Sequence, residues 1–427
     1  MSIGAVLFIT FFAALAFNVP IAFSLFLSSI VAMFMTSTPF EMIATSLFAA
    51  VSKFTLLAVP FFILAGMVME KAGVSKRLIH FANTCVGHIR GGLAIVMVIT
   101  ACFFAAISGS GPATVAALGV ILIPAMVKSG YDKGMAAALM ATCGGIGLII
   151  PPSISYVLYG VVAEQSIGKL FMAGVIPGLV VGACLIVASS IVSHKHNYGL
   201  KTAKATGKER WEAFKDAFWG LLTPVIILGG IYGGVFTPTE AAAVAAFYGM
   251  FVGFFVYKEL TIAKLKDLLI HTSLTTGMVL LIIGGATAFA WMVTTEGVAL
   301  QFSEAMLQTS RNPIAVLAVI NVIFLIAGCF LDGISITYIF VPLLVPVLQE
   351  LNIDLVHFGI ILTVNVAIGQ ITPPVGMNLF VACPIAGLSL MEISKSILPF
   401  LLASIVALLL ITYIPGLSLW LPRLLGM

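Results

Sequence analysis

A long charge-free stretch with a polar centre is the feature that most limits how this chain can fold. No charged residue occurs between Arg90 and Lys128, and the polar run SGSGPAT, residues 108–114, lies at its midpoint. A bilayer core about 30 Å thick needs about 20 helical residues to cross. The stretch is therefore too long for one span and too short for two spans and a turn. We predict a re-entrant hairpin over residues 92–127, because non-helical backbone at membrane depth is tolerated where it lines a buried or solvated site.

The chain as a whole is too apolar to be a soluble protein. Of its 427 residues, 61% are hydrophobic and 8% are charged, with a mean hydropathy of +1.20, whereas roughly a quarter of the residues of soluble domains are charged. We therefore expect an all-α polytopic membrane protein. The net charge of +4 is attributed to loops, and no nucleic-acid partner is expected. The N-terminus lacks a basic region and a cleavage site, so its first helix is expected to be retained.

The pattern of helices and breaks occurs twice along the chain. A shift of 222 positions brings Gly111 onto Gly333 and Pro151-Pro152 onto Pro373-Pro374. We interpret this as an internal repeat. Each copy is predicted to hold an amphipathic arm helix lying in the membrane interface, a hairpin and a broken helix. The first copy covers 1–193 (arm helix 39–53, hairpin 92–127, broken helix 134–163), a basic cytoplasmic connector covers 194–216, and the second copy covers 217–427 (arm helix 260–271, hairpin 312–349, broken helix 355–385).

Charge distribution indicates that the second copy is inverted. Five complete crossings in the first copy would turn the second copy over, because the hairpin adds none. Sixteen of the 20 basic residues then fall on one side, and Lys53, Lys169, Arg311 and Arg423 on the other. By the positive-inside rule the first side is cytoplasmic, so both termini are expected in the periplasm. Two hairpins that enter from opposite faces form the plan of a secondary transporter with a midplane site.

Broken helices expose main-chain groups that can hold ions. Freed carbonyls coordinate a hard cation, and the amide ends of half-helices attract an anion. Oxygen ligands suit sodium, by analogy with other hard cations, and an intramembrane carboxylate such as that of Asp332 is a functional candidate by default. The predicted sodium ligands are Ser108, Ser110, Gly144, Gly145, Asp332, Gly333, Ser335, Thr337, Gly369 and Thr372. The predicted substrate contacts are Thr114, Pro151, Pro152, Ser153, Pro373, Pro374 and Asn378. A further helix break is predicted at Gly144-Gly145.

Four motifs, taken in order, resemble those of a known family. They are FTLLAVPFF at 54–62, SGSGPAT at 108–114, Gly144-Gly145 with Pro151-Pro152-Ser153, and GQITPPVG at 369–376. Over its whole length the chain resembles the large membrane subunit of the tripartite ATP-independent periplasmic (TRAP) transporters. The resemblance implies a sodium-driven elevator transporter in the bacterial inner membrane. It also implies two partners: a periplasmic binding protein that delivers an organic acid, and a small four-helix membrane subunit, expected as a separate chain.

The substrate and two other functions stay open at this point. The chain looks most similar to the sialic-acid branch of the family, with a C4-dicarboxylate as the alternative. A scaffold or channel subunit of an ion-translocating complex is a second class. An intramembrane serine hydrolase is not favoured, because its nucleophile needs a histidine base and all six histidines are expected at helix ends or in loops. The six scattered cysteines lack a Cys-x-x-Cys motif, so no transition metal is expected, nor is an organic cofactor or enzymatic activity.

Overall fold

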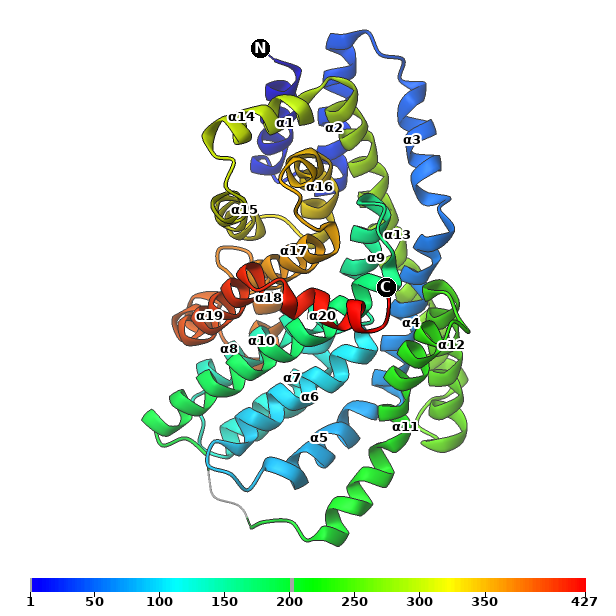
Figure 1. The fold of residues 1–427 in the computed structure, drawn as a ribbon. Helices are drawn as coiled ribbons and strands as arrows, with labels where there is room; N and C mark the ends of the chain where they lie inside the picture. Colours follow the sequence, from blue (N-terminus) through cyan, green and yellow to red (C-terminus); the bar gives the residue numbers. More distant parts are fainter. Residues whose placement is uncertain (1, 200–202) are drawn as a thin grey trace.

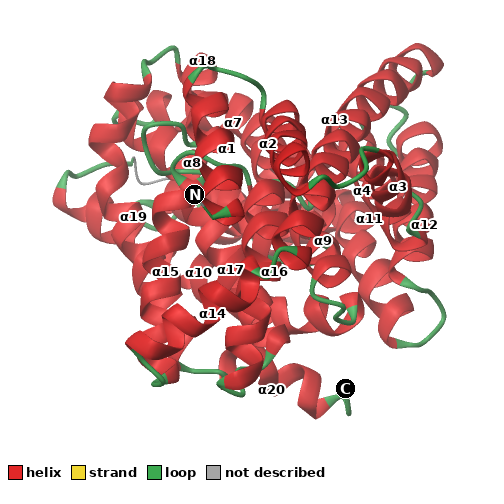
Figure 2. Ribbon diagram, turned by 90° about the horizontal axis from the view of Figure 1, so that it is seen from above, coloured by secondary structure: helices red, strands yellow, loops and turns green. Residues whose placement is uncertain are grey.

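The protein is built from α-helices. The computed structural model describes residues 2–199 and 203–427, and regular structure in these ranges is helical, with no strand (Figure 2). Eight helices are long and apolar enough to cross a membrane, or up to nine if the bent pair α8 and α9 counts as one span, among the described residues. The predicted all-α polytopic class is therefore confirmed.

One group of helices, here called the frame, packs together along one side of the molecule (Figure 1). Helix α13 packs against α2, α3 and α4, while α12 packs against α4 and α11. The frame consists of α1 (Ile3–Ala16), α2 (Ile21–Thr36), α3 (Glu41–Val51), η1 (Phe54–Leu57), α4 (Ala58–Lys71), α11 (Gly207–Tyr232), α12 (Pro238–Phe251), the π-helix η2 (Val252–Val256) and α13 (Ile262–Thr295).

A second group, here called the bundle, contains both predicted hairpins and both predicted broken helices. Helix α8 packs against α6, α7, α17, α18 and α19, so elements of the two sequence halves interleave around it. The bundle consists of α6 (Gly92–Ser108), α7 (Gly111–Lys128), α8 (Lys133–Ile149), α9 (Ile154–Val162), α10 (Ile167–Lys195), α15 (Pro313–Gly328), α16 (Gly333–Glu350), α17 (Leu355–Gly369), α18 (Met377–Ala386), α19 (Leu390–Tyr413) and α20 (Gly416–Leu424).

Two further helices connect the frame to the hairpins. Helix α5 (Val74–Val86) leads from α4 into α6, and α14 (Val298–Thr309) leads from α13 into α15. Each begins directly after a glycine with positive φ, Gly73 at +76° and Gly297 at +67°. Glycine adopts this left-handed conformation without steric cost, so each connecting helix can start at a sharp turn in the chain.

The two halves share one order of elements. Helices α7 and α16 begin 222 positions apart, at Gly111 and Gly333, and α8 and α17 begin 222 positions apart, at Lys133 and Leu355. The two hairpins lie in different parts of the molecule, α6–α7 in the lower half of Figure 1 and α15–α16 in the upper half. The breaks at 150–153 and 370–376 occupy equivalent positions in the two halves.

Two local predictions were wrong. Helix α8 is continuous through Gly144-Gly145, because both glycines are fully packed and this packing outweighs their weak helix propensity. Residues 260–271 do not form a separate arm helix but belong to α13. The first arm is separate because Pro60 stands in the first turn of α4, where its missing N–H fits a helix start; Ile282, 222 positions later, permits an unbroken helix.

The predicted connector is largely helical. Helix α10 extends to Lys195, and α11 begins at Gly207, where Thr206 and Glu209 form a capping box. Polar composition concealed the amphipathic start of α11, in which Ala213 and Ala217 are buried while Trp211 is exposed. Residues 200–202 of this predicted connector lie outside the described part of the chain.

Candidate transport site

Each hairpin tip is hydrogen-bonded to the helix break of its own half. The amide of Ile154, just after the first break, donates to the carbonyl of Gly109 at 3.4 Å. The amide of Val375, in the second break, donates to the carbonyl of Cys329 at 3.3 Å. The helices thus end and restart at places where two interrupted segments meet.

The first tip gathers three of the predicted polar residues. The hydroxyls of Ser108 and Thr114 lie 2.8 Å apart, and the Thr114 hydroxyl donates to the carbonyl of Ser110 at 2.8 Å. Ser108 and Thr114 are buried. Helix α6 can end here because Gly109 takes a φ of +60° as its C-cap. The tip therefore presents a compact group of hydroxyl and carbonyl oxygens, each with acceptor capacity left.

Helix α18 of the second half brings Asn378 into contact with the first hairpin. The Asn378 amide nitrogen Nδ2 donates to the carbonyl of Ala141 in α8 at 3.1 Å. A Cβ added to Gly144 would lie 2.8 Å from this nitrogen and 3.0 Å from the carbonyl oxygen of Gly111. Gly144 therefore serves close approach of α7, α8 and α18. The carbonyls of Gly144 and Gly145 lie inside a continuous helix, where they accept helical hydrogen bonds, which corrects the idea that a break frees them.

Two buried amide oxygens near the first tip lack a hydrogen-bond partner within the described chain. They are Oε1 of Gln370 and Oδ1 of Asn378. A Cβ added to Gly111 would lie 2.4 Å from the first and 2.9 Å from the second, so both oxygens lie beside the start of α7. Buried acceptors without a donor are costly, and such a pair can be satisfied by a cation or by water. The prediction missed Gln370, although it stands inside the GQITPPVG motif that marked the break.

Asp332 caps a helix at the second tip. Its carboxylate accepts from the amides of Ile334 at 3.2 Å and Ser335 at 3.3 Å, and from the Ser335 hydroxyl at 2.5 Å. The aspartate thus stabilises the N-terminus of α16. Asp332 was predicted from the sequence only as a sodium ligand, and this capping role was not predicted. Gly333 packs tightly against Val366 of α17, 2.6 Å from where a Cβ would lie.

The remaining predicted residues lie in the first turns of α16 or along the two breaks. The hydroxyls of Thr337 and Thr372 donate to the carbonyls of Gly333 and Ile368, each at 2.7 Å. The Ser153 hydroxyl donates to the carbonyl of Leu148 in the first break. The proline pairs that the sequence predicted as substrate contacts, Pro151-Pro152 and Pro373-Pro374, occupy the two breaks and have cis peptide bonds.

Both tips also face the frame. A Cβ on Gly66 of α4 would lie 3.0 Å from the Cα of Ser108. At the second tip an open, largely apolar groove of about 980 Å³ separates the bundle from the frame. Phe330, Leu331 and Val375 line its bundle side, and the α1–α2 turn, with Val19 and Pro20, lines its frame side. The groove makes the second tip accessible from the boundary between frame and bundle.

A buried polar network beside the second break escaped prediction. Asn365 donates to the side-chain oxygen of Asn321 at 2.8 Å, and Asn321 donates to the hydroxyl of Thr412 at 3.1 Å. The ring nitrogen Nε2 of His357 lies 3.2 Å from the carbonyl oxygen of Thr412.

Two histidines do not lie at helix ends or in loops, contrary to prediction: His80 lies in the middle of α5, and His271 lies inside α13. Within the described residues, no hydrogen bond links a histidine to Ser108 or Ser110.

Two interrupted hairpins and two interrupted helices around a buried polar centre define the class of membrane transport proteins. Residues 8–417 match the family described as "Tripartite ATP-independent periplasmic transporter, DctM component". The chain belongs to this family, whose members are transporter permeases and not enzymes, and it is a multi-pass inner-membrane protein.

Several named proteins are similar to this chain. The C4-dicarboxylate TRAP transporter large permease protein DctM of Pseudomonas aeruginosa is 46% identical, with 90% of each chain covered. The isethionate TRAP transporter permease protein DctMQ of Oleidesulfovibrio alaskensis is 43% identical; the match covers 97% of this chain and just under two thirds, 66%, of that longer protein. The sialic acid TRAP transporter large permease protein SiaM of Vibrio cholerae is 39% identical, with 95% of each covered. Among these three, the sialic-acid protein is not the most similar.

The fold has a counterpart among solved structures. The YdaH transporter of Alcanivorax borkumensis, described as having an unusual topology, superposes with a TM-score of 0.65 over 90% of this chain and 89% of that one. At 15% identity this similarity concerns the fold alone. It supports the overall helical fold described above.

Proposed function

We propose that this permease carries out sodium-coupled uptake of an organic acid. The observation that carries the proposal is the meeting of both hairpin tips with both helix breaks, together with the free oxygens of Gln370 and Asn378 beside α7. Oxygen-only groups of this kind suit a hard cation. The amide ends of half-helices would attract the carboxylate of the solute, with the bound cation adding positive charge.

The cation ligands in this proposal come from both halves of the chain. The hydroxyls and carbonyls of Ser108 and Ser110 supply one set, held in place by the Thr114 hydroxyl. The backbone around Gly369 and Thr372, together with the free side-chain oxygen of Gln370, supplies the other. Asp332 contributes its negative charge from the α16 cap. Gly144 and Gly145 are not included, because they serve packing.

We propose an elevator movement in which the bundle shifts relative to the frame. The separation of the helices into two packed groups, joined by the connecting helices α5 and α14 and by the chain between α10 and α11, supports this movement. In the proposed orientation both termini and the opening of the second hairpin lie on the periplasmic side, and the two halves, 1–193 and 217–427, form an inverted repeat. The concentration of basic residues on the opposite side supports that orientation.

The proposed partners are a periplasmic substrate-binding protein and a small membrane subunit. The family description names a tripartite transporter, and the isethionate relative is named DctMQ. For the solute, the higher identity to a C4-dicarboxylate permease than to the sialic-acid permease favours a C4-dicarboxylate over sialic acid.

The decisive experiment is uptake into proteoliposomes that contain this permease and its small subunit, with the cognate binding protein outside. Radiolabelled succinate, sialic acid and isethionate are compared with and without an inward sodium gradient. Accumulation of one acid that needs both sodium and the binding protein supports the proposal. Accumulation that does not depend on the sodium gradient contradicts it. Equilibration of the acid across the membrane without accumulation, as through a channel, also contradicts it.

A further inference from the structure

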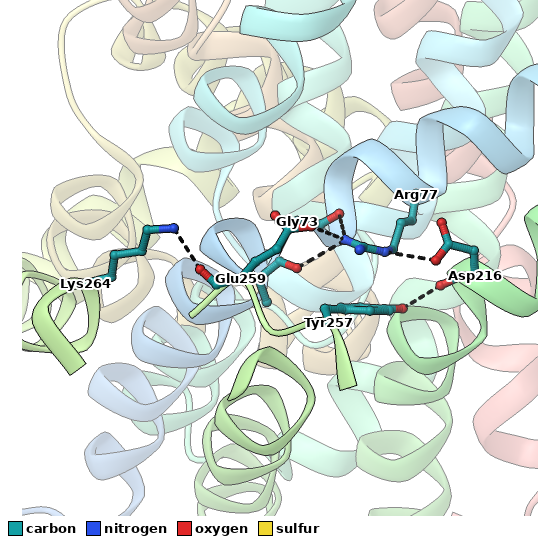
Figure 3. Close-up of polar contacts among 7 residues, drawn as sticks. Gly73, Arg77, Asp216, Tyr257, Glu259 and Lys264 are labelled. Atoms are coloured by element: carbon teal, nitrogen blue, oxygen red, sulfur yellow. Dashed lines mark hydrogen bonds and ion pairs between the residues drawn. The ribbon is translucent and has the colours of Figure 1, made fainter. Parts of the chain in front are cut away.

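Arg77 of α5 lies at the centre of a polar cluster that ties this connecting helix to the frame (Figure 3). Its Nε donates to Oδ1 of Asp216 in α11 at 3.1 Å, and its Nη1 donates to Oε1 of Glu259, just before α13, at 2.7 Å. Nη1 also donates to the carbonyl of Gly73 at 3.0 Å. The guanidinium lies 3.8 Å from the ring centroid of Tyr257, a cation–π geometry.

The partners of Arg77 are themselves held in place. The Tyr257 hydroxyl donates to the carbonyl of Asp216 at 2.7 Å, and Lys264 donates to the carbonyl of Glu259 at 2.7 Å. Burial lowers the pKa of Arg77, but the hydrogen bonds and charges of Glu259 and Asp216 outweigh this and raise it, so the group stays charged. A partly buried arginine that donates to two carboxylates stabilises a structure more than an exposed surface ion pair does.

No other ion pair joins two elements of the described chain. The third pair, Lys71 with Glu70, connects sequence neighbours at the end of α4. The two Arg77 pairs link residues 139 and 182 positions apart. Arg77 therefore provides the ionic connection between α5, α11 and the start of α13 within the described residues.

The equivalent turn before α14 carries no such cluster. A Cβ on Gly73 would lie 2.4 Å from Oε2 of Glu259, whereas a Cβ on Gly297 would meet nothing within 4 Å. The residue four positions after Gly297 is the exposed Gln301, where the first connecting helix has Arg77. Two connecting helices with the same start thus differ in attachment: the turn before α5 is covered and tied, and the turn before α14 is open.

We propose that Arg77 is a positioning residue that clamps the start of α5 to the frame. The proposal rests on the proposed function, since it assigns Arg77 a part in the movement of bundle against frame. With the Gly73 turn immobilised, the first hairpin moves by bending at residues 87–91, between α5 and α6, while the second hairpin moves by pivoting at Gly297. The clamp thus makes the two connecting helices, α5 and α14, mechanically different.

Hydrogen–deuterium exchange of the permease in lipid nanodiscs tests the clamp directly. Arg77→Ala is expected to raise amide exchange of residues 74–86 about tenfold and to leave α7 and α8 unchanged. Lys71→Ala is the matched control. It removes a basic residue close to Arg77 in sequence, at the end of α4, whose ion pair with Glu70 lies within one helix. We expect the exchange of residues 74–86 to be unchanged in this variant. Unchanged exchange in Arg77→Ala overturns the proposal.

A conservative variant covers the possibility that Arg77→Ala unfolds the frame. Arg77→Lys keeps the charge but cannot reach both carboxylates in fork geometry, so we expect a smaller rise confined to residues 74–86. If Arg77→Ala is globally unfolded and residues 74–86 of Arg77→Lys exchange at the wild-type rate, the proposal is overturned. In uptake assays Arg77→Lys is expected to lower the maximal rate several-fold and leave the KM for the acid unchanged, whereas a lower affinity for the acid contradicts a positioning role.

The exchange measurement separates the two proposals. If the wild-type permease shows no sodium-dependent uptake, the proposed function fails, while exchange of residues 74–86 still reports whether Arg77 clamps α5. If uptake behaves as proposed and exchange does not respond to Arg77→Ala, only the clamp fails.

Discussion

Gly328 and Gly369 pack backbone against backbone at the second helix break. A Cβ built on Gly328 would lie 2.8 Å from the Cα of Gly369, and a Cβ on Gly369 would lie 2.6 Å from the Cα of Gly328. Gly328 ends α15 and Gly369 ends α17. The second hairpin can therefore approach the broken helix only because both positions lack a side chain.

Gly328→Ala and Gly369→Ala are each expected to abolish uptake and to lower the unfolding temperature. The added methyl group meets backbone, which cannot rotate away, and overpacking of this kind costs about 1–3 kcal/mol. Thermal unfolding followed by size-exclusion chromatography, together with uptake, measures both effects. The matched control is Gly277→Ala in α13, where a Cβ would meet nothing within 4 Å; that variant is expected to behave as the wild type or to be slightly more stable.

The sequence predicted the interrupted architecture because breaks have strong local causes. SGSGPAT and the two proline pairs interrupt hydrogen bonding wherever they occur in a helix, and the observed breaks at 109–110, 150–153 and 370–376 follow them. The repeat shift of 222 positions is also visible in the helix starts. The positions of the helix breaks and the order of the elements in each half could therefore be predicted from the sequence alone.

What the sequence could not provide was tertiary packing. Gly144-Gly145 looks like a helix break locally, yet it stays helical because Asn378, 234 positions later, and Gly111 pack against it. The free oxygen of Gln370 became notable only once Gly111 lay beside it. Helix α5 was missed because it is short and polar, and its stabilising partners, Asp216 and Glu259, are distant in sequence.

Gln370→Ala is expected to raise the sodium concentration for half-maximal uptake about tenfold. The variant removes one of the two unpaired amide oxygens beside Gly111, and the loss of one cation ligand weakens binding without altering the fold. Uptake is measured as a function of sodium concentration at saturating acid.

The control for this prediction is Gln349→Ala, at an exposed position near the end of α16, which is expected to leave the sodium dependence unchanged. An unchanged sodium dependence in Gln370→Ala would remove Gln370 from the proposed cation site.

Two substitutions of Asp332 test the role of its negative charge and the role of its helix-capping hydrogen bonds separately. Asn is as good an N-cap as Asp, so Asp332→Asn is expected to retain nearly wild-type stability while requiring more sodium for uptake. Asp332→Ala loses the hydrogen bonds to Ile334 and Ser335 and is expected to lose about 1 kcal/mol of stability as well. Unfolding temperature and sodium-dependent uptake are measured for both. Normal sodium dependence in Asp332→Asn would mean that the carboxylate serves the helix alone.

Asn321 and Asn365 form a pair whose replacement tests the buried polar network. Removing either partner leaves the other without its hydrogen bond in a buried site, at a cost of about 1–3 kcal/mol. Asn365→Ala leaves the Asn321 side-chain oxygen unpaired, and Asn321→Ala frees the Thr412 hydroxyl as well. The double variant leaves fewer buried polar groups without a hydrogen-bond partner than the two single variants do together. Its loss of unfolding free energy is therefore expected to be smaller than the sum of the two single losses. Denaturant unfolding of the solubilised permease measures all three, with exposed Gln301→Ala as the control. Additive losses would show that the two amides stabilise the bundle independently.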